Sequence, residues 1–229
     1  MSGSAHESDD QVPAWARRTA GESRMMATAA VLVTIVLQIL LPNQFTPNPQ
    51  WLGPGLELLL LAVLIVANPT RINREENWLR TCSLVLATVL GLITAWSVDR
   101  LVMGLIDGQV SNNPGALLGS GAAIWLTNVV VFALWYWEFD RGGPAARAHA
   151  RNPYPDFLFV QMQNPNLTDP DWEPQFTDYL YMSFTNATAF SPTDVMPMTR
   201  WAKTTMMFQS AISLITMSLV IARAVNVLK

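Results

Sequence analysis

Charged side chains are scarce in this chain, and they are missing from whole stretches rather than thinned evenly. Only 14% of the 229 residues are charged, while 51% are hydrophobic. A soluble domain carries about a quarter charged residues, so the composition argues against a soluble domain. The net charge is −3 and there is no basic tract. We therefore expect no nucleic-acid partner, because nucleic-acid binding needs a positive surface.

Cysteine and histidine are also rare, which removes several kinds of site. The single Cys82 cannot form an intrachain disulfide, and its apolar surroundings predict that it packs in the core. The two histidines, His6 and His149, are too few for a His-rich metal site within one chain. The sequence contains no HExxH or GxSxG motif. We predict no metal, no cofactor and no enzymatic activity.

Long apolar blocks dominate what remains. A helix of about 20 residues crosses the roughly 30 Å core of a bilayer. The fourth block ends in Trp135, Tyr136 and Trp137, typical of an aromatic belt at a membrane interface. The sequence predicts an all-α integral membrane protein with five transmembrane helices, at residues 25–41, 51–67, 78–98 with an extension to 106, 116–137 and 204–222.

Four regions follow from this pattern. Residues 1–24 predict a mobile N-terminal tail, and 25–137 a four-helix transmembrane region. Residues 138–175 are rich in Pro and Asn and predict an irregular polar connection. In the last region, 176–229, a helix over 176–187 would be about 18 Å long, roughly half a bilayer. A half-length helix before a full span predicts a re-entrant pore helix and loop.

Residues 179–203 read YLYMSFTNATAFSPTDVMPMTRWAK. This segment resembles the pore region of tetrameric potassium channels, where an aromatic pore helix precedes T-A-T-T-V-G-Y-G-D and then x-x-P-x-T-x-W-G-R. The resemblance implies a homotetrameric ion channel that passes monovalent cations. The Tyr-Leu-Tyr-x-Ser-Phe-Thr block is also similar to an uncharacterised family of bacterial membrane proteins. The positions that match the channel pattern without a gap are Ser183, Ala187, Thr188, Asp194, Pro197, Thr199, Trp201 and the basic Lys203.

The filter itself departs from the channel pattern. Where potassium channels have T-V-G-Y-G, this chain has Ala189, Phe190, Ser191, Pro192 and Thr193. Without the glycines the backbone resists the conformations that aim successive carbonyls at an ion. We therefore predict a channel that does not select potassium, in which Thr188, Ser191 and Thr193 offer hydroxyls and Asp194 a ring of carboxylates. The alternative is a non-conducting scaffold or accessory subunit with a repurposed pore loop.

The last helix carries a polar stripe. Thr205, Gln209, Ser213 and Thr216 are spaced to share one face. This face predicts either pore lining or hydrogen bonds between helices. Two polar residues in other spans, Glu57 and Asn128, favour helix–helix hydrogen bonds.

Basic residues set the expected orientation. Eleven of the fourteen Lys and Arg residues lie in the N-terminal tail, around the second connection and in residues 138–203. The positive-inside rule makes that side cytoplasmic. We expect a protein of a bacterial inner membrane, surrounded by lipid, with its N-terminus in the cytoplasm. Its pore loop would then be inverted relative to that of potassium channels, unless the number of spans differs by one. We favour inversion, because the charge bias is large and residues 154–163 are too short for an extra span.

Overall fold

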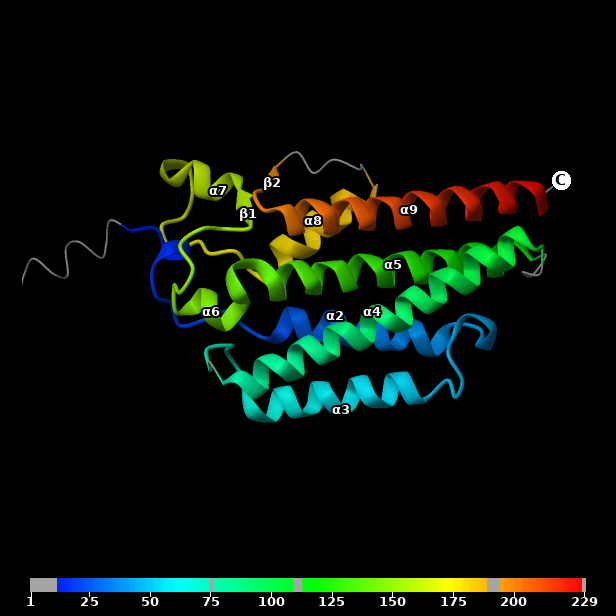
Figure 1. Cartoon of the computed structure of the whole chain (residues 1–229), viewed down its shortest axis with the longest axis horizontal. Coiled ribbons are helices and arrows are strands. Elements are labelled where there is room, and N and C mark those ends of the chain that lie inside the picture. Colours follow the sequence, from blue (N-terminus) through cyan, green and yellow to red (C-terminus); the bar gives the residue numbers. More distant parts are fainter. Residues whose placement is uncertain (1–11, 75, 109–112, 189–193, 228–229) are drawn as a thin grey trace, which may run out of the picture.

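The computed structural model of the chain describes residues 12–74, 76–108, 113–188 and 194–227, and these are mostly helical (Figure 1). The longer elements are α2 (Met25–Leu40), α3 (Leu52–Ala67), α4 (Asn77–Ile106), α5 (Pro114–Phe139), α8 (Phe176–Thr188) and α9 (Arg200–Val227). The short ones are η1 (Ala14–Ala16), η2 (Asn43–Phe45), η3 (Asp140–Gly142), α6 (Pro144–Ala148), β1 (Phe157–Phe159), α7 (Val160–Gln163), η4 (Pro165–Leu167) and β2 (Val195–Pro197).

Each of the five apolar segments forms a helix. Among the described helices, α4, α5 and α9 are long and apolar enough to cross a membrane, whereas α2 and α3 are apolar but have 16 residues each. Local signals fix their ends. Asn113 caps α5 by accepting the N–H groups of Gly115 and Ala116, and Pro114 occupies the first turn. Prolines at 42 and 69 follow the ends of α2 and α3, because proline cannot continue a helix.

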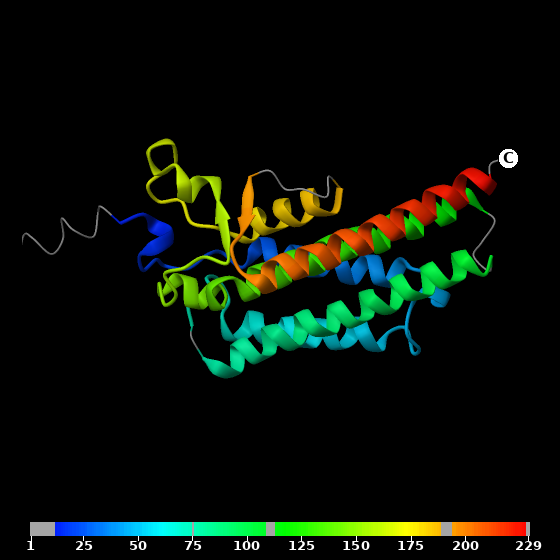
Figure 2. The ribbon, with the colours of Figure 1, turned by 45° about the horizontal axis from the view of Figure 1, so that its top comes forward.

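The helices pack as a bundle around α5. This helix contacts α2, α4, α8 and α9, while α3 packs on the outer side against α4 and α2 (Figures 1 and 2). Helices α5 and α9 approach each other closely towards the C-terminal end of α9. A Cβ atom built on Gly121 of α5 would lie 2.8 Å from both methyl carbons of Val220, so the absence of a side chain permits this approach.

Of the tail predicted over residues 1–24, residues 1–11 lie outside the described part of the chain, and residues 12–24 pack against the bundle. Ala14 and Glu22 are buried, and the N–H of Ile72 donates to the carbonyl of Glu22 at 3.0 Å. The predicted irregular connection also contains a strand. β1 pairs antiparallel with β2, with Leu158 opposite Met196. Local propensity gives little sign of either feature, because both depend on partners far away in the sequence.

The predicted aromatic belt at the end of α5 is wrong for two of its three residues. Tyr136 and Trp137 are buried within the protein, and Trp135 is half-buried. Trp135 donates its indole N–H to the carbonyl of Ala87 in α4 at 3.0 Å. These rings therefore hold helices together. From the sequence alone, aromatic residues buried between helices look the same as aromatic residues exposed at a membrane interface.

Candidate functional site

The half-length helix predicted over 176–187 is α8, and it ends near the middle of the bundle. Its 13 residues correspond to about 20 Å. Phe176 at its start packs against Trp137, at the end of α5. Ala187 at its other end contacts Ser213, near the middle of α9. β2 and the start of α9 lie back at the end of the bundle where α8 begins (Figure 1). The chain thus goes halfway along the bundle and returns to the same end.

The predicted filter residues lie mostly outside the described part of the chain, at Ala189, Phe190, Ser191, Pro192 and Thr193. Thr188, the last residue of α8, is exposed, and its hydroxyl donates to the carbonyl of Phe184 at 2.9 Å. Asp194 is half-buried, and its carbonyl accepts the N–H of Val160 at 3.2 Å. The ends of the predicted filter segment are therefore placed, and its middle stays a prediction.

The polar stripe of α9 points into the protein. Gln209, Ser213 and Thr216 are buried, and Thr205 is half-buried with its hydroxyl bonded to the carbonyl of Trp201. This arrangement agrees with interhelical hydrogen bonding, one of the two alternatives for the stripe. In the described protomer, the exposed apolar side chains of α9 belong to other positions, including Met207, Phe208, Leu214, Ile215, Ile221 and Val225.

Gln209 is the centre of a neutral network, which we call the amide network and which comprises Tyr136, Ser183, Asn186 and Gln209. The Gln209 amide donates to the Ser183 hydroxyl at 2.6 Å. Its carbonyl oxygen accepts from the Tyr136 hydroxyl at 2.7 Å and from the Asn186 amide at 2.8 Å. The Ser183 hydroxyl in turn donates to the carbonyl of Val129 in α5 at 2.6 Å. The amide network thereby joins α5, α8 and α9.

Side chains of α9 also satisfy backbone carbonyls of α8. The last four carbonyls of a helix have no partner within it. Ser213 donates its hydroxyl to the carbonyl of Ala187 at 2.6 Å, and Ser210 donates to the carbonyl of Asn186 at 3.2 Å. One turn earlier, the Gln209 amide donates to the carbonyl of Ser183 at 3.0 Å. The stripe thus provides partners for backbone carbonyls of the buried residues Asn186 and Ala187, near the end of α8.

The start of α8 is held by a second network, which we call the base network and which comprises Glu22, Asp140, Arg147 and Tyr179. A carboxylate oxygen of Glu22 accepts the N–H of Phe176 at 3.1 Å, so a side chain 154 residues upstream caps α8. Arg147 lies 3.6 Å from the Glu22 carboxylate and 5.0 Å from the centre of the Tyr179 ring. The Tyr179 hydroxyl donates to the Asp140 carboxylate at 2.5 Å.

Burial governs the electrostatics of the base network. It raises the pKa of Glu22 above its ordinary value, although the nearby Arg147 and the Trp137 N–H act in the opposite direction. Burial alone would lower the pKa of Arg147, but the oxygens of Tyr179, Asp140 and Glu22 raise it above the ordinary value. Arg147 therefore stays charged and serves as the shared cation for its acidic neighbours.

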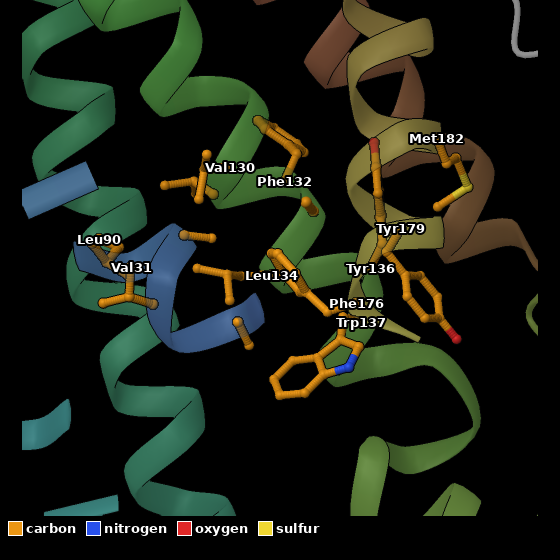
Figure 3. Packing of buried hydrophobic residues seen from close by; sticks show 14 of the residues in the cluster. Val31, Leu90, Val130, Phe132, Leu134, Tyr136, Trp137, Phe176, Tyr179 and Met182 are labelled. Atoms are coloured by element: carbon orange, nitrogen blue, oxygen red, sulfur yellow. The ribbon is translucent and has the colours of Figure 1, made fainter. Parts of the chain in front are cut away.

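Aromatic packing completes the contact between α5 and α8. Phe176, Tyr179 and Met182 belong to the same buried cluster as Tyr136 and Trp137 (Figure 3). The Trp137 and Phe176 rings meet edge to face, with centroids 5.8 Å apart. Such pairs stabilise beyond simple burial, so α8 is anchored by both polar and apolar contacts.

Three further predicted residues can be placed. Cys82 is half-buried and packs against the core, as expected. The Glu57 carboxylate of α3 accepts the Gln38 amide of α2 at 3.2 Å, which confirms a helix–helix hydrogen bond. Asn128 is buried in α5 and lines a cavity of about 380 Å³ between α4, α5 and α9. Among the described residues, no three His, Cys, Asp or Glu side chains gather as metal ligands would.

No family model, no curated protein and no solved structure matches this chain. The similarity of residues 179–203 to potassium-channel pore regions therefore stays a prediction from sequence. The interpretation of the site rests on its own contacts. Sequence reasoning missed Glu22, Arg147 and Asn186, which hold α8, and assigned Tyr136 to an interface. The four-residue spacing of Gln209 and Ser213 was the one signal that pointed to the amide network.

Proposed function

We propose that the protein is an integral membrane protein with five spans, α2, α3, α4, α5 and α9, and that α8 is re-entrant. The apolar, outward-facing side chains of α2 and α3 support this, among them Leu32, Val36, Leu59 and Val66. In water such a surface would favour aggregation, whereas lipid tails accommodate it. At 16 residues, α2 and α3 would each be about 24 Å long, so they would suit a locally thin bilayer.

The proposed orientation places the base network at the cytoplasmic side of a bacterial inner membrane. Residues 12–24, the connection between α3 and α4, α6 and the start of α9 all lie at one end of the bundle (Figure 1). This end carries most of the arginines, as the positive-inside rule requires of a cytoplasmic face. The proposed N-terminus is cytoplasmic, and the half-helix α8 starts from that side.

Labelling of single cysteines tests the orientation. After replacement of Cys82, Leu167→Cys marks the charged end and Asp107→Cys marks the opposite end, and both residues are exposed. In intact cells we expect an impermeant maleimide to react with the cysteine at 107 and to spare the one at 167. The reverse pattern would overturn the proposed orientation and leave the position of α8 unaffected.

The function that we propose is a homotetrameric pore-loop channel for monovalent cations without potassium selectivity. The observation that carries it is the path of α8, which goes halfway along the bundle between α5 and α9 and returns to its starting end. An outer helix, a half-helix and an inner helix in this order are the parts of a pore-loop module. The half-helix ends at the exposed Thr188, where copies could surround a common axis. Asp194, in the return segment, would supply the carboxylate ring.

A second candidate is a non-conducting scaffold or accessory subunit, and a specific contact pattern favours it. Gln209 and Ser213, which would line a pore in the channel hypothesis, are engaged by α8 within one protomer. A water-filled pore along this face of α9 would require those hydrogen bonds to be broken and replaced by hydrogen bonds to water. In this second hypothesis the stripe has one role, to hold a repurposed pore loop.

Reconstitution in liposomes separates the two candidates. For the channel we expect a detergent-solubilised mass of four copies, and a cation conductance whose reversal potential does not follow the potassium gradient alone. Asp194→Asn should reduce the preference for cations over anions, because it removes the carboxylate charge. Asp169→Asn, an exposed acid in the connection before α8, is the matched control and should leave selectivity unchanged.

Three outcomes would change the proposal. Absence of conductance from correctly assembled protein would establish the scaffold or accessory-subunit hypothesis instead. A reversal potential that tracks potassium alone would contradict the lack of selectivity, and a stable monomer in detergent and in bilayers would contradict the shared pore.

A further inference from the structure

A polar cavity lies at the charged end of the bundle, away from α8. It has a volume of about 320 Å³ and lies between the start of α2, the C-terminal end of α3, the start of α4 and the start of α6. Its charged lining consists of Arg24, Arg74, Arg80, Arg151, Glu76 and Glu138. Four arginines around one cavity are unusual in a chain with so few charges, and the amide and base networks do not use Arg74, Arg80 or Arg151.

Backbone carbonyls orient two of these arginines around the cavity. Arg24 donates its Nε to the carbonyl of Asn68 at 2.9 Å, and Arg74 donates Nη1 to the carbonyl of Ala67 at 3.0 Å. Arg80 and Gly142 both line the cavity. A guanidinium has five N–H groups in a planar fork. One bond to a carbonyl therefore leaves Arg24 and Arg74 with donors for a ligand.

The N-terminus of α4 adds a second source of positive potential. Asn77 and Leu79 in its first turn line the cavity together with Arg80. The first N–H groups of a helix carry partial positive charge and attract anions. Glu76, the residue before α4, accepts the indole N–H of Trp78 with its carboxylate. The two glutamates of the lining, Glu76 and Glu138, are outnumbered by its four arginines.

Glu138 is the buried acid in the cavity wall, whereas Glu76 is exposed. Arg147, Arg80 and Arg24 all interact electrostatically with its carboxylate. Burial lowers the pKa of Arg24, and Glu138 counteracts that effect. Glu138 is thus a common electrostatic partner of Arg24 and Arg80, while the guanidinium of Arg74, an exposed residue, donates to the neutral carbonyl of Ala67.

From this arrangement we propose that the cavity binds a phosphate group, with Arg74 and Arg80 as its main contacts. Arginine recognises phosphate oxygens through paired, charge-assisted hydrogen bonds, and a helix N-terminus suits the same charge. The phosphate belongs to an anionic phospholipid headgroup or to a soluble phosphate. Basic pockets at the cytoplasmic ends of membrane helices suit the former source. The site is independent of conduction through α8.

The test uses the full-length protein with Arg74→Gln and Arg80→Gln combined. Both side chains are exposed, so the fold should survive, and equal unfolding temperatures without ligand check this. Arg200→Gln is the matched control: Arg200 is exposed at the same end, at the start of α9, and does not line the cavity. Loss of each arginine should weaken binding roughly tenfold, because a hydrogen bond between charged groups contributes about 1.5–3 kcal/mol.

Two probes distinguish the sources of the phosphate. Inorganic phosphate is added in detergent, with chloride at equal ionic strength as reference, and the unfolding temperature is followed. Separately, native mass spectrometry counts phosphatidylglycerol against phosphatidylcholine retained from mixed micelles. Stabilisation by phosphate indicates a soluble ligand, and preferential retention of phosphatidylglycerol indicates a headgroup. Either effect must disappear in the double variant and persist in Arg200→Gln. Absence of both effects, or an equal effect in the double variant, overturns the site.

Discussion

The two networks that hold α8 differ in the kind of side chain that they use. The base network consists of charged groups and a tyrosine around Arg147, at the end of the bundle. The amide network, halfway along the bundle, uses hydroxyl and amide groups around Gln209. This division follows from the proposed bilayer. Charges are tolerated near the interface, where water lowers their cost, and neutral groups supply hydrogen bonds deeper in the membrane.

Arg147→Met should have the largest effect on stability, because it leaves buried acids without their shared cation. Removal of one partner from a buried ion pair costs about 3–5 kcal/mol. We expect a loss of this size in the free energy of unfolding, measured by reversible denaturation in detergent micelles. Arg200→Met, which removes an exposed arginine from the same end, is the control. If the two variants are equally stable, the base network does not hold α8.

Gln209→Leu should cost less, about 2 kcal/mol. The substitution leaves the polar groups of Tyr136, Ser183 and Asn186 without their common partner, but it leaves no charge unpaired. The same denaturation experiment measures it, with Ser218→Leu at an exposed position of α9 as the control. A loss as large as that of Arg147→Met would remove the predicted difference between the two networks.

The base network should also respond to pH, and the amide network should not. Because burial raises the pKa of Glu22, the folded protein binds this proton more tightly than the unfolded chain. Its contribution to stability is complete below the unfolded pKa and is lost as pH rises through the folded pKa. The stability of the natural protein relative to Glu22→Gln should therefore fall as pH rises above the ordinary pKa of a glutamate. A difference that is constant or rises would contradict the predicted direction.

The smallest effect is expected for an exposed ion pair at the same end. Arg17 and Asp171 approach to 2.7 Å, but the Asp171 side chain is 83% exposed. Pairs of this kind contribute about 0–1 kcal/mol, since water screens them. Arg17→Ala should change the free energy of unfolding by no more than this, and the change should shrink in high salt. A larger loss would show that residues 12–24 hold the base network through this contact as well as through Glu22.

The helices of the two networks could be predicted from sequence, and most of their contacts could not. Apolar blocks bounded by Pro and Asn located α2, α3 and α5, and the short block at 176–187 gave the length of α8. The spacing of Gln209 and Ser213 showed that they share a face. That face could not be assigned to a neighbour, because periodicity within one helix contains no information about which helix packs against it.

The contacts of the base network were even harder to predict from the sequence. Glu22 lies in a polar stretch without periodicity, and its partner Phe176 is 154 residues away. Arg147 lies among small residues in a segment that Pro and Gly made look irregular. Burial of such groups is decided by tertiary packing, so each looked like an ordinary solvated charge in the sequence.

The contacts of α8 have a consequence for biosynthesis. Its capping residue, Glu22, is synthesised before α8, whereas Gln209 and Ser213 are synthesised after it. The half-helix therefore lacks these hydrogen-bond partners when it is synthesised and gains them only once α9 has followed. In the proposed membrane protein, docking of α8 consequently comes after the synthesis of α9. A chain that stops before α9 would present unpaired carbonyls in lipid, a state that cellular quality control can recognise.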